Sequence, residues 1–270
     1  MTDQIADRFD AFLQRITLSS SEKSAALEQG RLLSRRIEQR PEVRECLITG
    51  SMARSTAIRK FSDVDIVAVI EPGDQLAHSD SATLVSSVAN ILRKMEPEVQ
   101  VSENAVRVLH TDGSVVDVLA AIHSGTNNTA DDIYRIPATN QEGWETYAPE
   151  EQNRRIREAT ESLGEDFKKL IRLCKWWSKT HGQPISSYEI ELVTYDTFRD
   201  GLPELPRALV ELFDSIKQSS SINPLKMPTF LESKALAEEA YSNQQLGNTQ
   251  KAIELWGRLF GDQFAATVIT

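Results

Sequence analysis

Three aspartates in two short apolar segments carry the clearest chemical signal of this 270-residue chain. Asp63 and Asp65 stand two positions apart at the start of a β-branched run. Because side chains alternate along an extended strand, both carboxylates are expected on the same face. Asp117 is the only charged residue of a second apolar run, Gly113–Ile122, where an isolated carboxylate needs a partner.

Carboxylates gathered on one face repel one another, and a hard divalent cation such as Mg2+ relieves that repulsion most simply. If the two runs are neighbouring strands, Asp63, Asp65 and Asp117 can hold two metal ions about 3.5–4 Å apart. One ion would bind an attacking hydroxyl and the other a leaving phosphate, an arrangement suited to in-line phosphoryl transfer. We therefore expect these three residues to be both catalytic and metal-binding, with two Mg2+ ions as cofactor and Mn2+ as a substitute.

A Gly-Ser pair precedes these aspartates, with Ser51 twelve residues before Asp63. Gly50 follows a predicted strand over Glu45–Thr49. Glycine lets the backbone approach a phosphate closely, and free N–H groups at a helix start favour an anion. The pair alone is weak evidence, because a serine cap beside strand-edge carboxylates has the same composition. Together with the aspartates, we interpret Gly50 and Ser51 as nucleotide-binding residues.

A helix with an apolar face and a basic face is predicted from Glu165 to His181. Its basic residues recur at i, i+4, i+7 and i+11 and form one positive stripe: Lys168, Arg172, Lys175 and Lys179. A solvated helix face and a phosphate-binding surface explain this stripe equally well. Soon afterwards Ser186, Ser187 and Tyr188 open another predicted helix.

These motifs resemble those of the DNA-polymerase-β-like nucleotidyltransferases, which have Gly-Ser, then Asp-x-Asp, then a distant Asp on a neighbouring strand. Within that superfamily the chain resembles the bacterial CD-NTases, the cGAS/DncV-like enzymes of the SMODS type. In that family a helix lysine and a serine hold the triphosphate, and the following tyrosine stacks on the base. The matching residues here are Lys175, Ser187 and Tyr188. A point charge, a hydroxyl at a helix start and an aromatic face suit these tasks.

The resemblance spans most of the chain. Ile136–Pro137 and Trp144–Pro149 are similar to the family's connector, and Leu255–Phe264 is similar to its closing helix. It implies an α/β (α+β) fold: a polymerase-β-like core with a mixed sheet, followed by a helical C-terminal lobe. We expect residues 1–150 to form the catalytic lobe with its N-terminal helices, and residues 151–270 to form a helical lobe that binds nucleotide and substrate.

The predicted helices agree with this division. The patterns indicate helices over 2–16, 21–39 (capped by Ser20 or Ser21) and 81–95, and from residue 151 onward over 151–163, 165–181, 187–199, 206–218, 231–246 and 249–260. Cysteine and histidine spacings do not indicate a zinc site.

Charge and hydropathy bear on partners and location. With 30 basic and 40 acidic residues the net charge is −10, which disfavours long nucleic acids as substrates. No apolar run approaches the roughly 20 residues that cross a bilayer, and the polar start Met1–Gln4 does not resemble a signal peptide. We therefore expect a cytoplasmic protein that does not bind membranes.

The resemblance implies an enzyme that joins NTPs, ATP among them, into a cyclic di- or oligonucleotide second messenger with release of pyrophosphate, in antiphage signalling. It also leaves room for a regulatory protein partner. One alternative is a polymerase-β-like enzyme that transfers nucleotides to tRNA or other RNA, to a protein or to a small molecule. Another is a pseudoenzyme that only binds nucleotide, which the three repelling carboxylates disfavour.

Overall fold

The computed structural model describes residues 4–71, 80–102, 104–138, 143–219 and 222–265. The chain forms two compact units. Residues 19–55 and 62–154 form the first, here called the sheet unit, and residues 1–18, 56–61 and 155–270 form the second, the helical unit. This division places residues 1–18 and 56–61 with the helical unit, whereas the sequence analysis had assigned them to the catalytic lobe.

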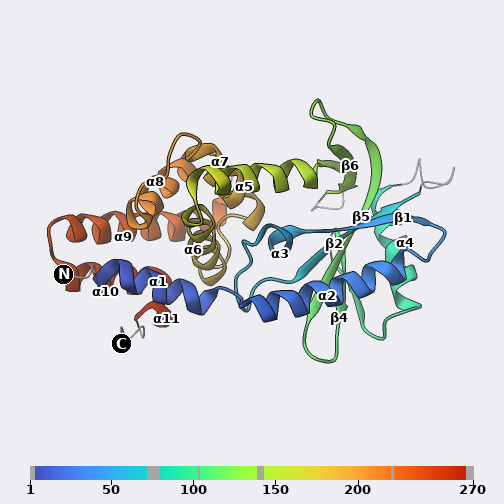
Figure 1. Cartoon of the computed structure of the whole chain (residues 1–270), viewed down its shortest axis with the longest axis horizontal. Helices are drawn as coiled ribbons and strands as arrows, with labels where there is room; N and C mark the ends of the chain where they lie inside the picture. The colour runs from blue at the N-terminus through green and yellow to red at the C-terminus, as the bar shows by residue number, and fades with distance from the viewer. Residues whose placement is uncertain (1–3, 72–79, 103, 139–142, 220–221, 266–270) are drawn as a thin grey trace. The chain divides into compact units, whose positions relative to one another are not determined.

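The sheet unit holds a seven-stranded sheet in the order β1-β2-β5-β4-β3, with β6 paired to β5 and β7 paired to β6 (Figure 1). Its elements are α2 (Ser20–Ile37), β1 (Val43–Thr49), α3 (Gly50–Arg54), β2 (Val64–Ile70), α4 (Ser81–Arg93), β3 (Val99–Val101), β4 (Ala105–Leu109), β5 (Val115–Thr126), β6 (Asp132–Pro137) and β7 (Trp144–Tyr147). Strands β2 and β5 run parallel, and the other pairs among the described strands are antiparallel. The sheet is therefore mixed, as expected.

Strand β2 lies inside the sheet, which explains its apolar sequence. All its residues are buried except Asp65, which is half-buried. One face of this strand carries Val64 and packs under α2, where Gly30 comes so close that a Cβ on it would lie 2.7 Å from Val64 Cγ1. The other face carries Asp65 and then Val67 and Val69, which join a buried apolar cluster with Tyr134. This face of β2 therefore begins with the Asp65 carboxylate and continues with buried apolar residues.

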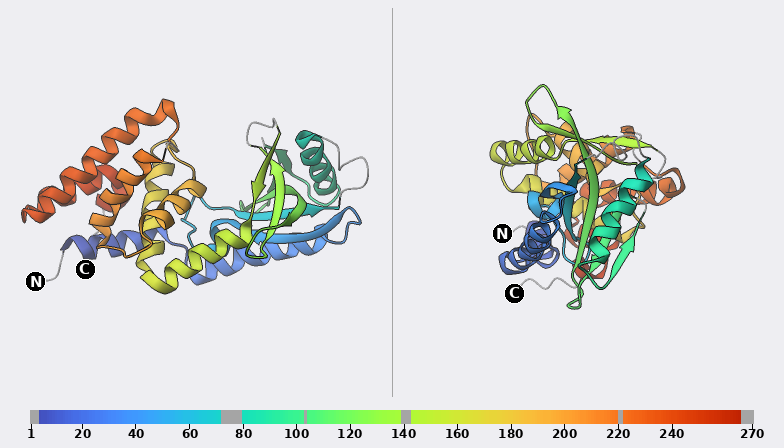
Figure 2. Two further views of the ribbon diagram at one scale, coloured as in Figure 1. Left: turned by 90° about the horizontal axis from the view of Figure 1, so that it is seen from above. Right: turned by 90° about the vertical axis from the view of Figure 1, so that its right-hand side faces the viewer.

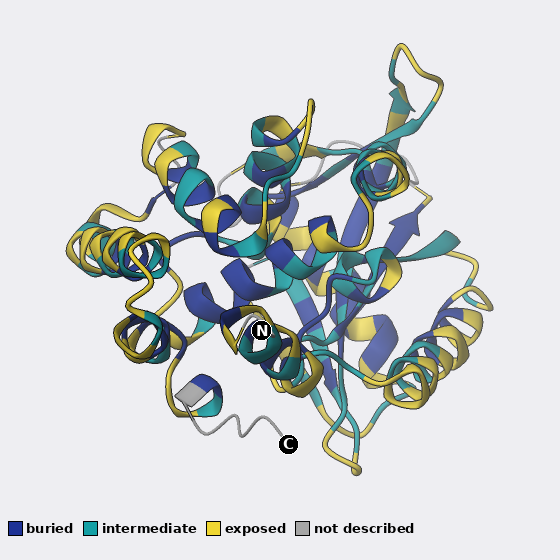
Figure 3. Cartoon of the chain, turned by 60° about the vertical axis from the view of Figure 1, so that its left-hand side comes forward, coloured by how far each residue is buried: buried dark blue, intermediate teal, exposed yellow. Residues whose placement is uncertain are grey.

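The helical unit contains α1 (Gln4–Ile16), the main part of α5 (Pro149–Leu163), α6 (Asp166–Thr180), α7 (Ser187–Thr197), α8 (Leu205–Gln218), the 3-10 turn η1 (Pro224–Lys226), α9 (Met227–Gln245), α10 (Thr249–Phe260) and α11 (Asp262–Ala265). Figure 2 shows these helices from two further directions. Many helices expose one side and bury the other, seen as yellow and dark blue in Figure 3.

Aromatic side chains fill the core of the helical unit. Phe9 of α1 meets the rings of Trp256 and Phe264 edge to face, with ring centroids 5.3 and 5.2 Å apart. The indole Nε1 of Trp176 in α6 donates a hydrogen bond of 3.1 Å to the carbonyl of Phe260. Helix α6 is buried on nearly every side, because the other helices surround it.

The expected fold class is confirmed, and the predicted helices form with ends shifted by a few residues. Residues 2 and 3 of the first predicted helix lie outside the described residues. Helix α2 is capped by Ser19, not by Ser20 or Ser21, because Ser19 forms a reciprocal capping box with Glu22. The segments interpreted as a connector are strands β6 and β7 of the sheet. Within the described ranges no helix is long and apolar enough to cross a membrane.

Candidate active site

The three predicted catalytic aspartates lie together at one end of the two parallel strands. Asp63 directly precedes β2, Asp65 is its second residue, and Asp117 lies in β5. The β2–β5 register places Asp65 opposite Asp117. Sequence spacing predicted carboxylates on one face, and the sheet register now supplies the pairing that spacing alone could not.

Arg107 of β4 is the direct partner of these carboxylates. The antiparallel β4–β5 register places Arg107 opposite Asp117 on its other side. Its Nε and Nη2 each donate a hydrogen bond of 2.8 Å to Asp117, one to each carboxylate oxygen. The same Nη2 lies 3.4 Å from Asp63 Oδ2. A guanidinium fork therefore holds Asp117 from two sides and reaches Asp63 as well.

The electrostatics of this cluster follow from these contacts. The hydrogen bonds to Asp117, and then the charges of Asp117, Asp63 and Asp65, raise the pKa of Arg107 above its ordinary value. The Arg107 side chain is 43% exposed, and that of Asp117 is 23% exposed. Arg107 is not predictable from the segment Ala105–Leu109 alone, because its contact with Asp117 depends on the pairing of two strands.

Gly50 lies directly against the carboxylate of Asp65, a position that only a residue without a side chain can occupy. Its φ is +73°, a left-handed conformation that favours glycine, and a Cβ there would lie 1.7 Å from Asp65 Oδ2. The Gly-Ser motif is thus required in part to make room for Asp65. Ser51 follows in the short helix α3 and is half-buried.

The fit of a divalent metal can be judged from this arrangement. Carboxylate oxygens of Asp63, just before β2, and of Asp117, in β5, both contact one cation, the Arg107 guanidinium. In the described part of the chain, no three carboxylate, imidazole or thiol groups are gathered into a ready-made metal cage. The donor set suits Mg2+, which takes one or two carboxylates and completes its shell with water and phosphate oxygens. The chemistry of these carboxylates is compatible with this ion if Asp117 changes its partner, and binding of Mg2+ by Asp63, Asp65 and Asp117 stays a prediction.

Lys175 lies in the helical unit and is buried, with a side chain 2% exposed. Its Nζ lies 2.6 Å from Glu191 Oε1, which is fully buried, and donates a hydrogen bond of 3.0 Å to Thr56 Oγ1. Thr56 in turn donates to Glu191 Oε1 over 2.5 Å. Lys175 thus belongs to a buried polar triad rather than to an open helix face.

The predicted basic stripe is consequently divided. Arg172 is half-buried, and burial lowers its pKa. Lys168 is 16% exposed and pairs with Glu165, and Lys179 donates to Gln183. The prediction of a single basic stripe facing solvent is therefore wrong, because other helices surround α6.

The Ser-Ser-Tyr segment opens α7 as predicted. Ser186 caps this helix through a capping box with Glu189, so Ser187 is the first helical residue and is half-buried. Tyr188 is 47% exposed. The structure places Lys175, Ser187 and Tyr188 in the helical unit and the aspartates in the sheet unit. Their assignment as nucleotide-binding residues stays a prediction.

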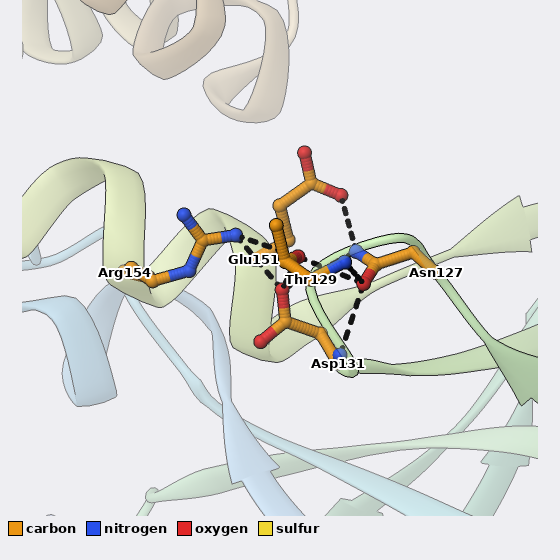
Figure 4. A network of polar contacts seen from close by, with 5 residues as sticks. All are labelled: Asn127, Thr129, Asp131, Glu151 and Arg154. Carbon is orange, nitrogen blue, oxygen red and sulfur yellow. Dashed lines mark hydrogen bonds and ion pairs between the residues drawn. The ribbon is translucent and has the colours of Figure 1, made fainter.

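A further polar cluster joins the β5–β6 hairpin to α5 (Figure 4). Asp131 accepts hydrogen bonds from Thr129 Oγ1 (2.6 Å) and from Arg154 Nη2 (2.8 Å). Asn127 Nδ2 donates to Glu151 Oε2 over 3.1 Å. The contacts with Thr129, then with Arg154, hold the pKa of Asp131 at about 2. These residues tie the hairpin tip to the helix, and none of them is among the predicted site residues.

Comparison with known proteins identifies the family. Residues 3–159 match the family described as the Second Messenger Oligonucleotide or Dinucleotide Synthetase domain. A probable cyclic nucleotide synthase from Bacillus cereus is 25% identical over 273 residues, covering 82% of each chain. The CBASS oligonucleotide cyclase CdnC from Escherichia coli is 22% identical over 271 residues, covering 82% of this chain and 83% of that one.

Solved structures agree with the fold. CdnC of E. coli MS115-1, solved with ATP, superposes with a TM-score of 0.80 at 19% identity, covering 95% of this chain and 98% of the other. CdnG of Bradyrhizobium diazoefficiens, solved with GTP, superposes with a TM-score of 0.76 at 15% identity, covering 98% and 97%. The matched family covers more than half of the sequence and includes the three aspartates. The chain therefore belongs to the Second Messenger Oligonucleotide or Dinucleotide Synthetase family of nucleotidyltransferases.

Proposed function

We propose that this family member joins NTPs into a cyclic di- or oligonucleotide, with Asp63, Asp65 and Asp117 as its catalytic residues. The observation that carries the proposal is the register of Asp65 against Asp117 on adjacent parallel strands, with Asp63 joined to the same cluster through Arg107. Each step forms a phosphodiester bond between a nucleotide hydroxyl and an α-phosphate, and pyrophosphate leaves.

The three carboxylates have distinct tasks in this proposal. Asp63 and Asp65 would hold a cation beside the triphosphate, and Asp117 would complete the site for the attacking hydroxyl and accept its proton. When bound, Mg2+ supplies charge neutralisation at the phosphates and lowers the pKa of the attacking hydroxyl. Gly50 and Ser51 lie at the same strand end, where Gly50 comes close to Asp65. Their backbone N–H groups would bind a phosphate held there.

Nucleotide recognition is assigned to the helical unit. Tyr188 is exposed and offers a ring face for base stacking, and Ser187 lies beside it at the start of α7. We assign triphosphate contact to Lys175 by family resemblance, and such contact requires its ammonium to share or exchange its bond to Glu191. The proposed nucleotide-binding residues therefore come from both units: Gly50 and Ser51 from the sheet unit, and Lys175, Ser187 and Tyr188 from the helical unit.

The relatives support the cyclic product and a signalling role. One is named a CBASS oligonucleotide cyclase, and another, 23% identical, a cyclic AMP-AMP-AMP synthase. CdnC has been solved with ATP and CdnG with GTP, which supports NTPs as substrates here. CdnC has also been solved in complex with HORMA, which supports a regulatory protein partner. A net charge of −10 favours small nucleotides over long nucleic acids.

The catalytic assignment is tested by pyrophosphate release from a mixture of ATP, GTP, CTP and UTP with Mg2+. We expect the wild-type protein to release pyrophosphate and an Asp63→Asn/Asp65→Asn variant to lose at least 99% of that rate while keeping its melting temperature. Asp117→Asn should lose turnover but still bind NTP. A double variant that retains more than a few percent of the activity would show that the chemistry lies elsewhere.

A further inference from the structure

Arg107 offers a cation to the carboxylates that are proposed to bind metal. Its planar fork is bidentate on Asp117, with both bonds at 2.8 Å, and its Nη2 lies 3.4 Å from Asp63 Oδ2. The side chain comes from β4, the strand on the far side of β5 from β2, and faces Asp117 in register. Arg107 is therefore built into the sheet and is not a chance surface contact.

Both Asp117 oxygens are engaged by this fork, and they are the atoms that a metal would need. A divalent cation held by Asp65 and Asp117 would also stand close to the guanidinium, and two positive charges at such a distance repel each other. Arginine stays protonated at any working pH, so it cannot yield its place by losing a proton. It can leave only by moving its side chain, which is 43% exposed and has solvent to move into.

We propose that Arg107 is an internal counter-ion that neutralises Asp63 and Asp117 when no metal is bound, and that metal binding must displace it from Asp117. It is a positioning residue in this role: it keeps repelling carboxylates in place for a cation that arrives with the nucleotide. It also lowers the affinity of the site for a metal ion without nucleotide, because such an ion must first break a bidentate ion pair. The inference rests on the metal-binding role proposed above for these aspartates.

The test is a Mn2+ titration of the protein without nucleotide, in which electron paramagnetic resonance measures the concentration of unbound Mn2+. We expect Arg107→Met to bind Mn2+ about tenfold more tightly than the wild type, because the competing cation is gone. Arg107→Lys should lie between the two, since an ammonium keeps the charge but cannot form the fork. Arg135→Met is the matched control, since Arg135 lies on β6 of the same sheet, over the Trp144 ring, and it should bind as the wild type does.

Thermal melting in EDTA gives a second readout. Arg107→Met should melt at a lower temperature than the wild type, because Asp117 loses its bidentate partner. Adding Mn2+ should then raise the melting temperature of Arg107→Met more than that of the wild type. In an Asp117→Asn background, Arg107→Met should cost less stability than in the wild type.

The outcomes separate the two proposals. If the wild type binds Mn2+ and Arg107→Met binds it no more tightly, Arg107 does not compete with metal and this inference is overturned. If the wild type, Arg107→Met and Arg107→Lys all fail to bind Mn2+, with or without ATP, the proposed metal site itself is overturned, and this inference with it. If Arg107→Met does not fold, an unchanged or weaker Mn2+ affinity in Arg107→Lys overturns the inference.

Discussion

At the scale of single residues, the site depends on a few side chains whose neighbours come from distant parts of the sequence. One row of residues lies in register across β1, β2, β5 and β4, in the order Thr49, Asp65, Asp117 and Arg107. The aspartates stand out in their own segments, but only the strand register brings them beside Thr49 and Arg107. A change at one of these positions, or beside one of them, is therefore expected to act on its neighbours.

Gly50 gives the sharpest residue-scale prediction. Gly50→Ala places a methyl group 1.7 Å from Asp65 Oδ2 and adds a left-handed backbone strain of about 1–2 kcal/mol. We expect at least a hundredfold loss of pyrophosphate release because Asp65 must move. Gly113→Ala is the matched control, since Gly113 has φ +83° but nothing within 4 Å of a Cβ. Equal activity losses in the two variants would show that strain, and not the position of Asp65, explains the effect.

Lys175 and Tyr188 were both assigned to the nucleotide site, yet their environments predict different behaviour. Lys175→Met leaves the buried carboxylate of Glu191 without its ammonium and should lower the free energy of unfolding by about 3–5 kcal/mol. Chemical denaturation checks this, and a Lys175→Met protein as stable as the wild type would show that the buried ion pair does not stabilise the fold.

Tyr188→Ala removes a ring that is 47% exposed, so it should cost far less stability than Lys175→Met. It should weaken NTP binding by about 1–3 kcal/mol, because a stacking contact with the base is lost. ATP titration of the variant checks this, and an unchanged ATP affinity would contradict the assignment of Tyr188 to the nucleotide site.

At the scale of elements, the capped and amphipathic helices were the most predictable part. Helix α10 occupies the predicted residues 249–260, because its apolar face repeats with a helical period up to Gly261. The strands β3, β4, β6 and β7 were not identified one by one, since they are three to six residues long and their pairing is non-local. The burial of α6 was missed for a similar reason: the partner of Lys175 is sixteen positions away, in α7.

The β5–β6 hairpin gives an element-scale prediction about pH. The pKa of Asp131 lies at about 2, below its ordinary value, because Thr129 and Arg154 hold its charged form. A lowered carboxylate pKa stabilises the fold above the unfolded value near 4, and that contribution fades as the pH falls toward 2. The melting-temperature difference between wild type and Asp131→Asn should therefore be present at pH 6 and shrink between pH 4 and 2. A difference that stays constant across this range would show that the charge of Asp131 does not hold the hairpin to α5.

At the scale of the whole molecule, the sequence predicted the family and the fold class, because both depend on local motifs and on the periodicity of single elements. It placed residues 1–18 in the catalytic lobe, whereas their aromatic side chains Phe9 and Phe12 pack with Phe260 and Phe264 of the helical unit. A sequence shows that a helix has an apolar face, but it does not show which distant helix covers that face.

Mass spectrometry of the product made from ATP, GTP, CTP and UTP with Mg2+, after phosphatase treatment, decides whether this protein makes a cyclic nucleotide. We expect a phosphatase-resistant species with the mass of a closed ring of two or more nucleotide monophosphates, absent with the Asp63→Asn/Asp65→Asn variant. A ladder of linear oligomers, or label found only on added tRNA, protein or a small molecule, would contradict it and favour nucleotide transfer to another acceptor.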